Sequence, residues 1–95
     1  MEIKQSQEGN KGSFYIEDKD GEKIALMTYS VAGSSRIIID HTEVDEVLKG
    51  KGAGKQLVQA AVDYARNNNL KILPLCPFAR SVFERTREFD DVNDL

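Results

Sequence analysis

The fold of this chain is decided by one stretch of its sequence, Leu48-Lys49-Gly50-Lys51-Gly52-Ala53-Gly54-Lys55. Its three glycines let the backbone turn tightly and bring amide groups close to a ligand without obstruction by Cβ atoms. From Gly52 to Asn68 the apolar residues recur at three- and four-residue spacing, which predicts a helix that begins inside the stretch. The first amides of a helix attract anions, and the three lysines add positive charge. The stretch therefore predicts a phosphate site; the alternative is a plain glycine-rich connection with a basic edge.

The spacing of the glycines excludes two other phosphate-binding loops. A Walker loop needs a glycine where this chain has Lys49, and a serine or threonine where it has Gln56. A dinucleotide-binding fingerprint needs a glycine three residues after its second one, and Lys55 or Leu57 stands there instead. The predicted phosphate site belongs to neither class.

Three strands are predicted upstream of the glycine stretch. Ser13–Asp18 holds an aromatic and β-branched run, and Asp20-Gly21 fits the positive φ of a tight hairpin turn. Lys23–Val31 alternates between a largely apolar and a mixed face, and Arg36–Val44 begins with three isoleucines that favour a strand. A purely structural strand has little reason to carry the polar run Asp40–Glu43 unless it leaves the sheet there or lines a site. We therefore expect an antiparallel sheet whose last strand ends at a functional site.

A further strand and a second helix are predicted downstream. Leu70–Leu75 is typical of a short strand and Phe78–Arg87 of a helix, whereas the acidic last eight residues are expected to be loose. A strand, a helix and a strand in succession imply a right-handed crossover with parallel pairing, which should stop at Pro74 because proline has no amide to donate. These elements predict one α+β domain over residues 1–95, with a mostly antiparallel sheet, a crossover helix after the glycine loop and a C-terminal helix.

The composition limits the class of protein. The 16 acidic residues outnumber the 13 basic ones and give a net charge of −3, which argues against a nucleic-acid binder. No apolar run reaches the roughly 20 residues of a membrane span, and the N-terminus lacks a signal-peptide pattern. The single cysteine, Cys76, excludes an internal disulfide. We therefore expect a cytoplasmic monomer without membrane or nucleic-acid partners, and we assign no metal ligands.

The glycine stretch resembles motif A of the GCN5-related N-acetyltransferases (GNAT), which is written Arg/Gln-x-x-Gly-x-Gly/Ala. Gly52 and Gly54 match the glycines of the motif, and Lys49 stands in the Arg/Gln place, where it keeps the charge but loses the guanidinium geometry. Together with Ile39–Val44 and Leu75–Ala79, the stretch looks like the very short branch of this superfamily that occurs as stand-alone small proteins. The resemblance covers over half of the chain.

The resemblance implies a truncated GNAT fold and an enzyme that moves an acetyl group from acetyl-CoA to an unknown amine. In this superfamily the strand before the glycine loop and the strand after the helix splay apart, and the pantetheine arm lies between them. Carried over by position, Val44 would offer its backbone to the pantetheine. The pyrophosphate would be wrapped by Lys49, Gly50, Lys51, Gly52, Ala53, Gly54 and Lys55. Arg80, in the first turn of the last predicted helix, is expected to meet the phosphates of the cofactor, whereas Phe78 and Phe83 are interpreted as core residues.

Cys76 and His41 are the candidate catalytic residues, because they stand near the ends of the two strands that are expected to splay. A thiolate is a strong nucleophile in acyl transfer, and a nearby imidazole can take the thiol proton. The hypothesis is a double displacement in which Cys76 accepts the acetyl group and an amine then removes it. The alternative is direct attack by the amine, with His41 or Glu43 as general base and Cys76 as packing.

Two further classes of function compete with an enzyme. A non-catalytic acyl-CoA-binding module would bind the thioester without turnover. The chain has no room for the helices that ordinary family members place after their first strand, so its acceptor side is expected to be open. A protein-interaction domain that uses the acidic tail would have no affinity for coenzyme A.

Overall fold

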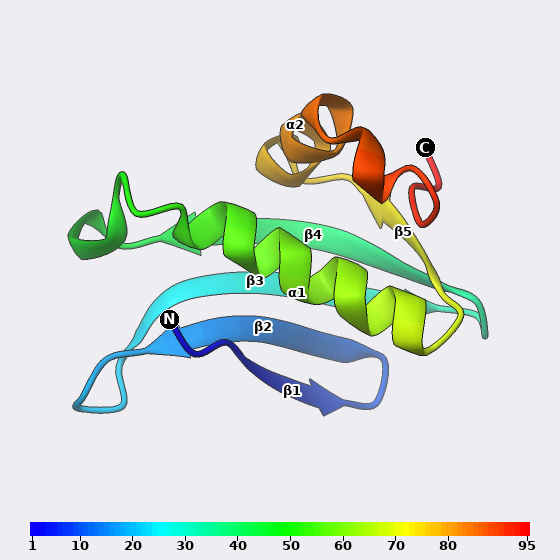
Figure 1. Ribbon diagram of the computed structural model, residues 1–95. Coiled ribbons are helices and arrows are strands. Elements are labelled where there is room, and N and C mark those ends of the chain that lie inside the picture. The colour runs from blue at the N-terminus through cyan, green and yellow to red at the C-terminus, as the bar shows by residue number, and fades with distance from the viewer.

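Five strands form one sheet in which spatial neighbours are also neighbours in sequence. The computed structural model, which describes residues 1–95, gives the strands as β1 (Lys4–Glu8), β2 (Lys11–Glu17), β3 (Lys23–Ala32), β4 (Arg36–Val44) and β5 (Lys71–Pro74). The first four strands run antiparallel, and β5 pairs in parallel with β4 (Figure 1). The predicted α+β fold, with antiparallel strands and one parallel crossover, is confirmed.

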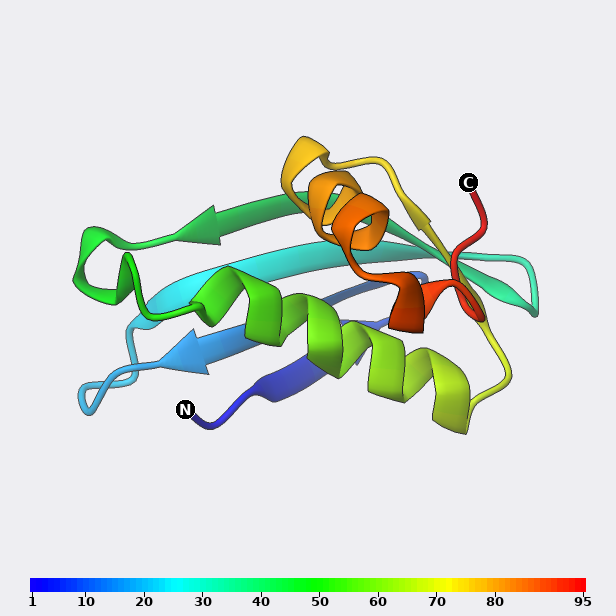
Figure 2. The ribbon, with the colours of Figure 1, turned by 45° about the horizontal axis from the view of Figure 1, so that its top comes forward.

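Two helices cover one face of this sheet (Figure 2). Helix α1 (Ala53–Asn67) connects β4 to β5, and helix α2 (Pro77–Arg85) follows β5. Short 3₁₀ turns, η1 (Glu46–Leu48) and η2 (Arg87–Phe89), lie before α1 and after α2. Helix α1 ends where its asparagines predict, since Asn69 adopts the left-handed conformation with φ of 55°. None of the helices is long and apolar enough to cross a membrane.

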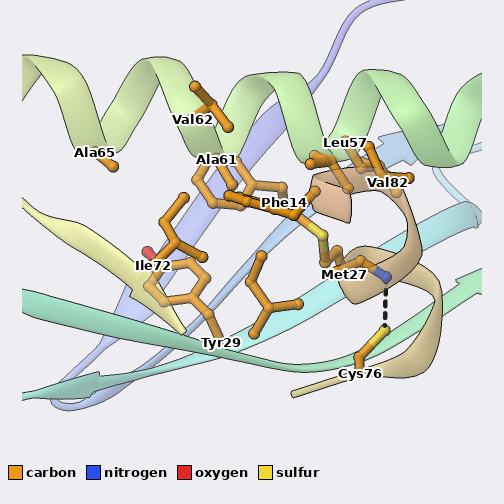
Figure 3. Packing of buried hydrophobic residues seen from close by; sticks show 14 of the residues in the cluster. Phe14, Met27, Tyr29, Leu57, Ala61, Val62, Ala65, Ile72, Cys76 and Val82 are labelled. Atoms are coloured by element: carbon orange, nitrogen blue, oxygen red, sulfur yellow. Dashed lines mark hydrogen bonds between the residues drawn. The ribbon is translucent and has the colours of Figure 1, made fainter. Parts of the chain in front are cut away.

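The core lies between the sheet and the two helices and forms one cluster of 21 buried residues. Figure 3 shows Met27 and Tyr29 of β3 pointing from the sheet toward α1, where Leu57 and Ala61 meet them. Met27, Leu57 and Ala61 are fully buried. Burial of each large apolar side chain stabilises the fold by about 1.5–3 kcal/mol, so alternation along β3 and the apolar stripe of α1 fix which face of each element is internal.

The edge strand β1 has no counterpart among the predicted elements. All five of its residues are exposed, so its sequence carries no apolar alternation. It pairs with β2 along its whole length, and Tyr29 adds two side-chain contacts: its hydroxyl donates to Oε1 of Gln7 at 2.7 Å and accepts from Nε2 of Gln5 at 2.8 Å. The ring of Tyr29 crosses β2 at Gly12, where any Cβ would lie 2.4 Å from its Cζ. A glycine at that position is what allows the buried phenol to reach β1.

The prediction that the last eight residues are loose is wrong. The amide of Ile72 in β5 donates to the carbonyl of Val92, and the amide of Asp94 donates back to the carbonyl of Ile72. Arg66 of α1 holds the carboxylate of Asp91 through two hydrogen bonds of 2.9 and 3.0 Å, and Arg36 of β4 pairs with Asp94 at 2.6 Å. The acidic tail is therefore fixed along the free edge of β5 by arginines that are distant in sequence.

Candidate active site

The two parallel strands separate at Pro74. Pairing of β4 with β5 ends at Ile39 and Pro74, as predicted from the missing amide of proline. The amides of Leu75 and Cys76 both donate to the carbonyl of Ile39, each at 3.2 Å, and the chain then turns into α2. The remainder of β4, residues 40–44, consequently has no strand beside it on the side of β5.

A β-bulge in β4 decides which side chains face the helices at this split. The register with β3 skips Asp40, which is an extra residue without a partner. Simple alternation from the buried Ile39 would direct His41 toward the helices. The extra residue reverses the phase, so that Thr42 lies opposite Met27 on the helix side and His41 lies on the other face.

Cys76 lies on the helix side of the split, at the residue that precedes α2. Its Sγ accepts a hydrogen bond from the amide of Ala79 at 3.5 Å and therefore caps the helix (Figure 3). The hydroxyl Oγ1 of Thr42 lies 3.2 Å from the same sulfur. Cys76 is buried, with a relative exposure of 5%, and belongs to the core cluster. The only thiol of the chain is therefore in contact with the start of α2 and with the hydroxyl of Thr42.

The structure does not bring His41 and Cys76 together. The imidazole of His41 is 63% exposed on the face of the sheet that carries no helix, and its Nε2 lies 3.5 Å from Oε1 of Glu43. An imidazole on this face has no direct path to the proton of a thiol on the opposite face. It can instead act on a group that approaches from the open face.

The glycine loop presents free amides at the start of α1. The first hydrogen bond along the helix is donated by the amide of Gln56 to the carbonyl of Gly52, at 3.0 Å. The amides of Ala53, Gly54 and Lys55 therefore have no intrahelical acceptor. Gly52 occupies the capping position in the left-handed conformation, with φ of 73°, and offers no side chain to cap them. Three donors and the positive end of the helix dipole are thus available to an anion.

A pocket of about 350 Å³ lies between this helix start and α2. It is lined by Val44, Leu48, Lys49, Gly50, Gly52, Ala53, Gly54, Lys55, Phe78, Val82, Arg85 and Thr86. Seven of the nine residues that the sequence predicts to bind a cofactor are among them. Lys51 and Arg80 do not line the pocket, and Nε of Arg80 lies 3.8 Å from a carboxylate oxygen of Glu84. The pocket therefore joins the predicted loop to a second wall that comes from α2.

Positive charge is available on the loop side of the pocket. Lys49 forms an ion pair of 2.7 Å with Glu46 in η1. Lys55 forms no ion pair, so its ammonium group is free to meet an anion at the start of α1. The field of the helix start and the charge of Lys55 act in the same direction.

Five lining residues were missing from the prediction: Leu48, Phe78, Val82, Arg85 and Thr86. Phe78 is 39% exposed and lies against the start of α1, where a Cβ added to Gly54 would be 2.6 Å from its Cζ. The interpretation of Phe78 as a core residue is therefore wrong. Phe78, Val82 and Arg85 are four and three residues apart, and this spacing places them on one stripe of a helix. Arg80 falls off that stripe, so helical spacing alone could have favoured Arg85 over Arg80.

The pocket and the thiol lie along the same edge of β4. Thr42, which contacts Cys76, and Val44, which lines the pocket, face the same side of the strand because they are two residues apart. Two residues of extended strand span roughly 7 Å. Thr42 and Cys76 do not themselves line the pocket, and the unpaired edge of β4 is what connects the pocket to the buried thiol.

Comparison with known proteins identifies the family to which this chain belongs. A family model described as GCN5-related N-acetyl-transferase matches residues 13–92. The chain is similar to Protein NATD1 of Xenopus tropicalis, at 33% identity over 52 residues that make up 55% of this chain and 48% of that protein. Protein NATD1 of Homo sapiens matches at 33% identity over 55% of this chain and 46% of its own length. The match thus spans about half the length of these curated relatives.

Solved structures share the fold over most of the chain. The NMR solution structure of a candidate GCN5-like N-acetyltransferase from Staphylococcus aureus has a TM-score of 0.75 at 43% identity and covers 97% of this chain and 86% of that chain. The ribosomal-protein-S18-alanine N-acetyltransferase from Escherichia coli has a TM-score of 0.67 at 14% identity and covers 83% and 53% of the two chains, which shows the common fold alone. The family match over residues 13–92 and the shared fold lead to one conclusion: the chain belongs to the GCN5-related N-acetyltransferases, a family of acyl-transferring enzymes.

Proposed function

We propose that the protein transfers the acetyl group of acetyl-CoA to an amine. The observation that carries this proposal is the pocket between α1 and α2, in which three free amides at the start of α1 lie at one end of the unpaired edge of β4. Acetyl-CoA has the matching shape, because a pyrophosphate is joined to a long, flexible pantetheine arm that carries the thioester.

The pyrophosphate is assigned to the amides of Ala53, Gly54 and Lys55, with the ammonium group of Lys55 beside them. The pantetheine then follows residues 40–44 of β4, whose backbone groups on this side have no strand partner. Its amides take the place of the missing strand, as an added strand does at a sheet edge. The thioester is assigned to the neighbourhood of Thr42 and Cys76, roughly 7 Å along the strand from Val44.

Cys76 is proposed to carry the acetyl group. Its sulfur attacks the carbonyl carbon of the thioester, the bond from that carbon to the sulfur of coenzyme A breaks, and the thiol proton of Cys76 passes to the departing sulfur. An amine then attacks the acetyl-cysteine, which yields the amide and restores the thiol. The amide of Ala79 at the start of α2 donates to Sγ, and the hydroxyl of Thr42 lies beside it, so both groups can orient the sulfur for the attack.

The acceptor amine is proposed to arrive from the face of the sheet that carries no helix. His41 and Glu43 lie on this face at the split, and both are well exposed. A neutral imidazole there can take the proton that the amine loses as the amide forms. The same pair would serve direct transfer from acetyl-CoA to the amine, without an acetyl-cysteine.

Calorimetry with coenzyme A tests the binding half of the proposal. Lys55→Glu reverses the free charge at the start of α1 and is expected to weaken binding by tenfold or more, the equivalent of about 1.4 kcal/mol. Lys19→Glu is the matched control, because Lys19 is exposed in the turn between β2 and β3 and lies outside the pocket. Absence of binding by the unaltered protein would overturn the proposed function.

Intact-mass spectrometry after incubation with acetyl-CoA tests the chemical half. The protein is expected to gain the mass of one acetyl group, Cys76→Ser is expected to gain none, and addition of an amine is expected to remove the group. Amide formation by Cys76→Ser at the rate of the unaltered protein would establish direct transfer instead. Tight binding without any transfer to a panel of amines would identify a non-catalytic acyl-CoA-binding module.

A further inference from the structure

We infer that Arg85, at the end of α2, forms a separate phosphate subsite that binds the 3′-phosphate on the adenosine half of coenzyme A. The inference rests on the proposed function and deepens it, because it assigns a residue that selects coenzyme A over ligands that share only its pyrophosphate. The glycine loop assigns no role to Arg85, and the family resemblance gives the cofactor phosphates to Arg80 instead.

The first support is the position of Arg85 on the pocket wall. Phe78, Val82 and Arg85 form a stripe along α2 that faces the pocket, and Phe78 lies against Gly54 at the start of α1. Arg85 is seven residues beyond Phe78, which is two turns or about 10 Å along the helix. An anion that meets Arg85 is therefore distinct from the one held by the amides beside Gly54.

The second support is the state of the guanidinium group. Arg36, Arg66 and Arg80 each lie within 4.0 Å of a carboxylate, whereas Arg85 has no such partner. Its Nε donates to the carbonyl of Ser81 at 3.2 Å, which anchors the side chain and leaves the two terminal nitrogens for a ligand. A planar guanidinium with two free nitrogens matches a phosphate monoester through paired hydrogen bonds.

The third support is the direction of the ligand. Cys76 precedes α2 and marks the acyl end of the site, and Arg85 closes the same helix nine residues later, roughly 13 Å away along its axis. The part of coenzyme A that is most remote from the thioester is the adenosine with its 3′-phosphate. The monoester therefore falls at the end of the pocket that Arg85 and Thr86 line.

A purely structural role for Arg85 makes a different prediction. A cation in the last turn of a helix stabilises it through the helix dipole. In that case replacement of Arg85 would lower the melting temperature and would leave ligand selectivity as it was.

The test is calorimetric titration of the full chain with coenzyme A and with 3′-dephospho-coenzyme A. We expect the unaltered protein to bind coenzyme A about tenfold or more tightly than the dephospho form, as hydrogen bonds between charged groups provide. Arg85→Gln is expected to bind coenzyme A only as tightly as it binds the dephospho form. Its affinity for the dephospho form is expected to differ less than twofold from that of the unaltered protein. Arg85→Lys is expected to keep part of the selectivity, since the charge remains. Arg87→Gln, an exposed arginine outside the pocket, is the matched control and is expected to keep all of it.

Each other outcome overturns the inference. If the unaltered protein binds both ligands with equal affinity, no subsite for the 3′-phosphate exists. If Arg85→Gln loses the same factor of affinity for both ligands, Arg85 contacts the pyrophosphate instead. A lowered melting temperature with unchanged selectivity establishes the structural role. Failure of both ligands to bind the unaltered protein would instead refute the proposed function, and so the two failures are distinguishable.

Discussion

The hydroxyl Oγ1 of Thr42 lies 3.2 Å from Sγ of Cys76, across the split between β4 and α2. It is the only side-chain hydroxyl that contacts the thiol, and it reaches it because the bulge at Asp40 turns Thr42 toward the helices. A hydroxyl can orient a thiol and can donate to a developing thiolate. We therefore expect Thr42 to position the thiol of Cys76.

Thr42→Val is expected to slow the reaction of Cys76 while the fold is retained. Valine keeps the shape of the side chain and removes the hydrogen bond, whose net contribution is about 1 kcal/mol, or roughly fivefold in rate. The measurement is the rate at which acetyl-CoA acetylates Cys76, followed by intact mass, with the rate of alkylation by iodoacetamide as a second readout. Thr28→Val on β3 is the control, because Thr28 faces the open side beside His41. Equal rates for all three proteins would show that the contact has no role.

The same bulge marks the limit of prediction from sequence in the site. The isoleucines of β4 and the period of two in a strand predict the inner face as far as Ile39. One unpaired residue, Asp40, then reverses the phase, and its presence depends on pairing with β3 rather than on its own type. The sequence changes from apolar residues at Ile37 and Ile39 to polar residues after Asp40, and a bulge explains this change. A strand that simply ended at Asp40 would show the same change, so the sequence does not distinguish the two.

Gly54→Ala is expected to weaken binding of coenzyme A more than it weakens the fold. Alanine gains about 1 kcal/mol of helix propensity over glycine, and its Cβ would meet Cζ of Phe78 at 2.6 Å. Because Phe78 is 39% exposed, its ring can turn away into the pocket. We expect the free energy of unfolding in urea to change by less than about 1 kcal/mol and the affinity for coenzyme A to fall by about tenfold.

Gly54→Ala combined with Phe78→Leu is the companion variant, and it should recover affinity because the smaller side chain clears the pocket. A loss of more than about 2 kcal/mol of stability in Gly54→Ala would show that the ring is fixed and that the glycine serves packing.

The pair of Arg66 and Asp91 is expected to make the fold sensitive to acid. The hydrogen bond from Arg66 holds the pKa of Asp91 below its usual value of 3.8, and burial opposes this only in part. Because the pKa is lower in the folded state, the pair stabilises the fold above about pH 4, and this contribution disappears as the pH falls through the pKa of the folded state. Asp91→Asn should therefore lower the melting temperature at pH 7, and the difference from the unaltered protein should shrink as the pH falls below about 4.

Asp20→Asn is the control for this experiment, since the carboxylate of Asp20 forms no ion pair in the turn between β2 and β3. The difference in melting temperature between Asp20→Asn and the unaltered protein should be the same at every pH. A difference for Asp91→Asn that stays constant as the pH falls from 7 to well below 4 would mean that the charge of Asp91 is not what matters.

The tail and the edge strand show why other parts of the fold were not predictable. The sequence near Asp91 carries the composition of a solvated tail, and its partners Arg66 and Arg36 are 25 and 58 residues away from their respective carboxylates. β1 consists only of polar residues, and its side-chain contact with the rest of the sheet comes from the phenol of Tyr29, which passes over Gly12. In both places long-range polar contacts take the place of the apolar periodicity on which prediction from sequence depends. The central strands and both helices bury apolar stripes, and these elements were predicted.

His41→Ala is expected to leave acetylation of Cys76 unchanged and to slow the transfer from Cys76 to an amine. The imidazole lies on the open face, 63% exposed and beside Glu43, so it cannot take the proton of a thiol on the helix side. A general base typically contributes about 10²- to 10⁴-fold to a proton transfer, so loss of the acetyl group to excess ethylamine should slow by at least tenfold. Both steps are followed by intact mass after rapid mixing.

Ser13→Ala, on the same open face and paired with Thr28, is the control for His41→Ala and should change neither step. If His41→Ala prevents acetylation of Cys76 itself, the imidazole acts across the strand and the separation of the two faces does not govern the chemistry. If it changes neither step, proton removal from the amine needs no residue on this face.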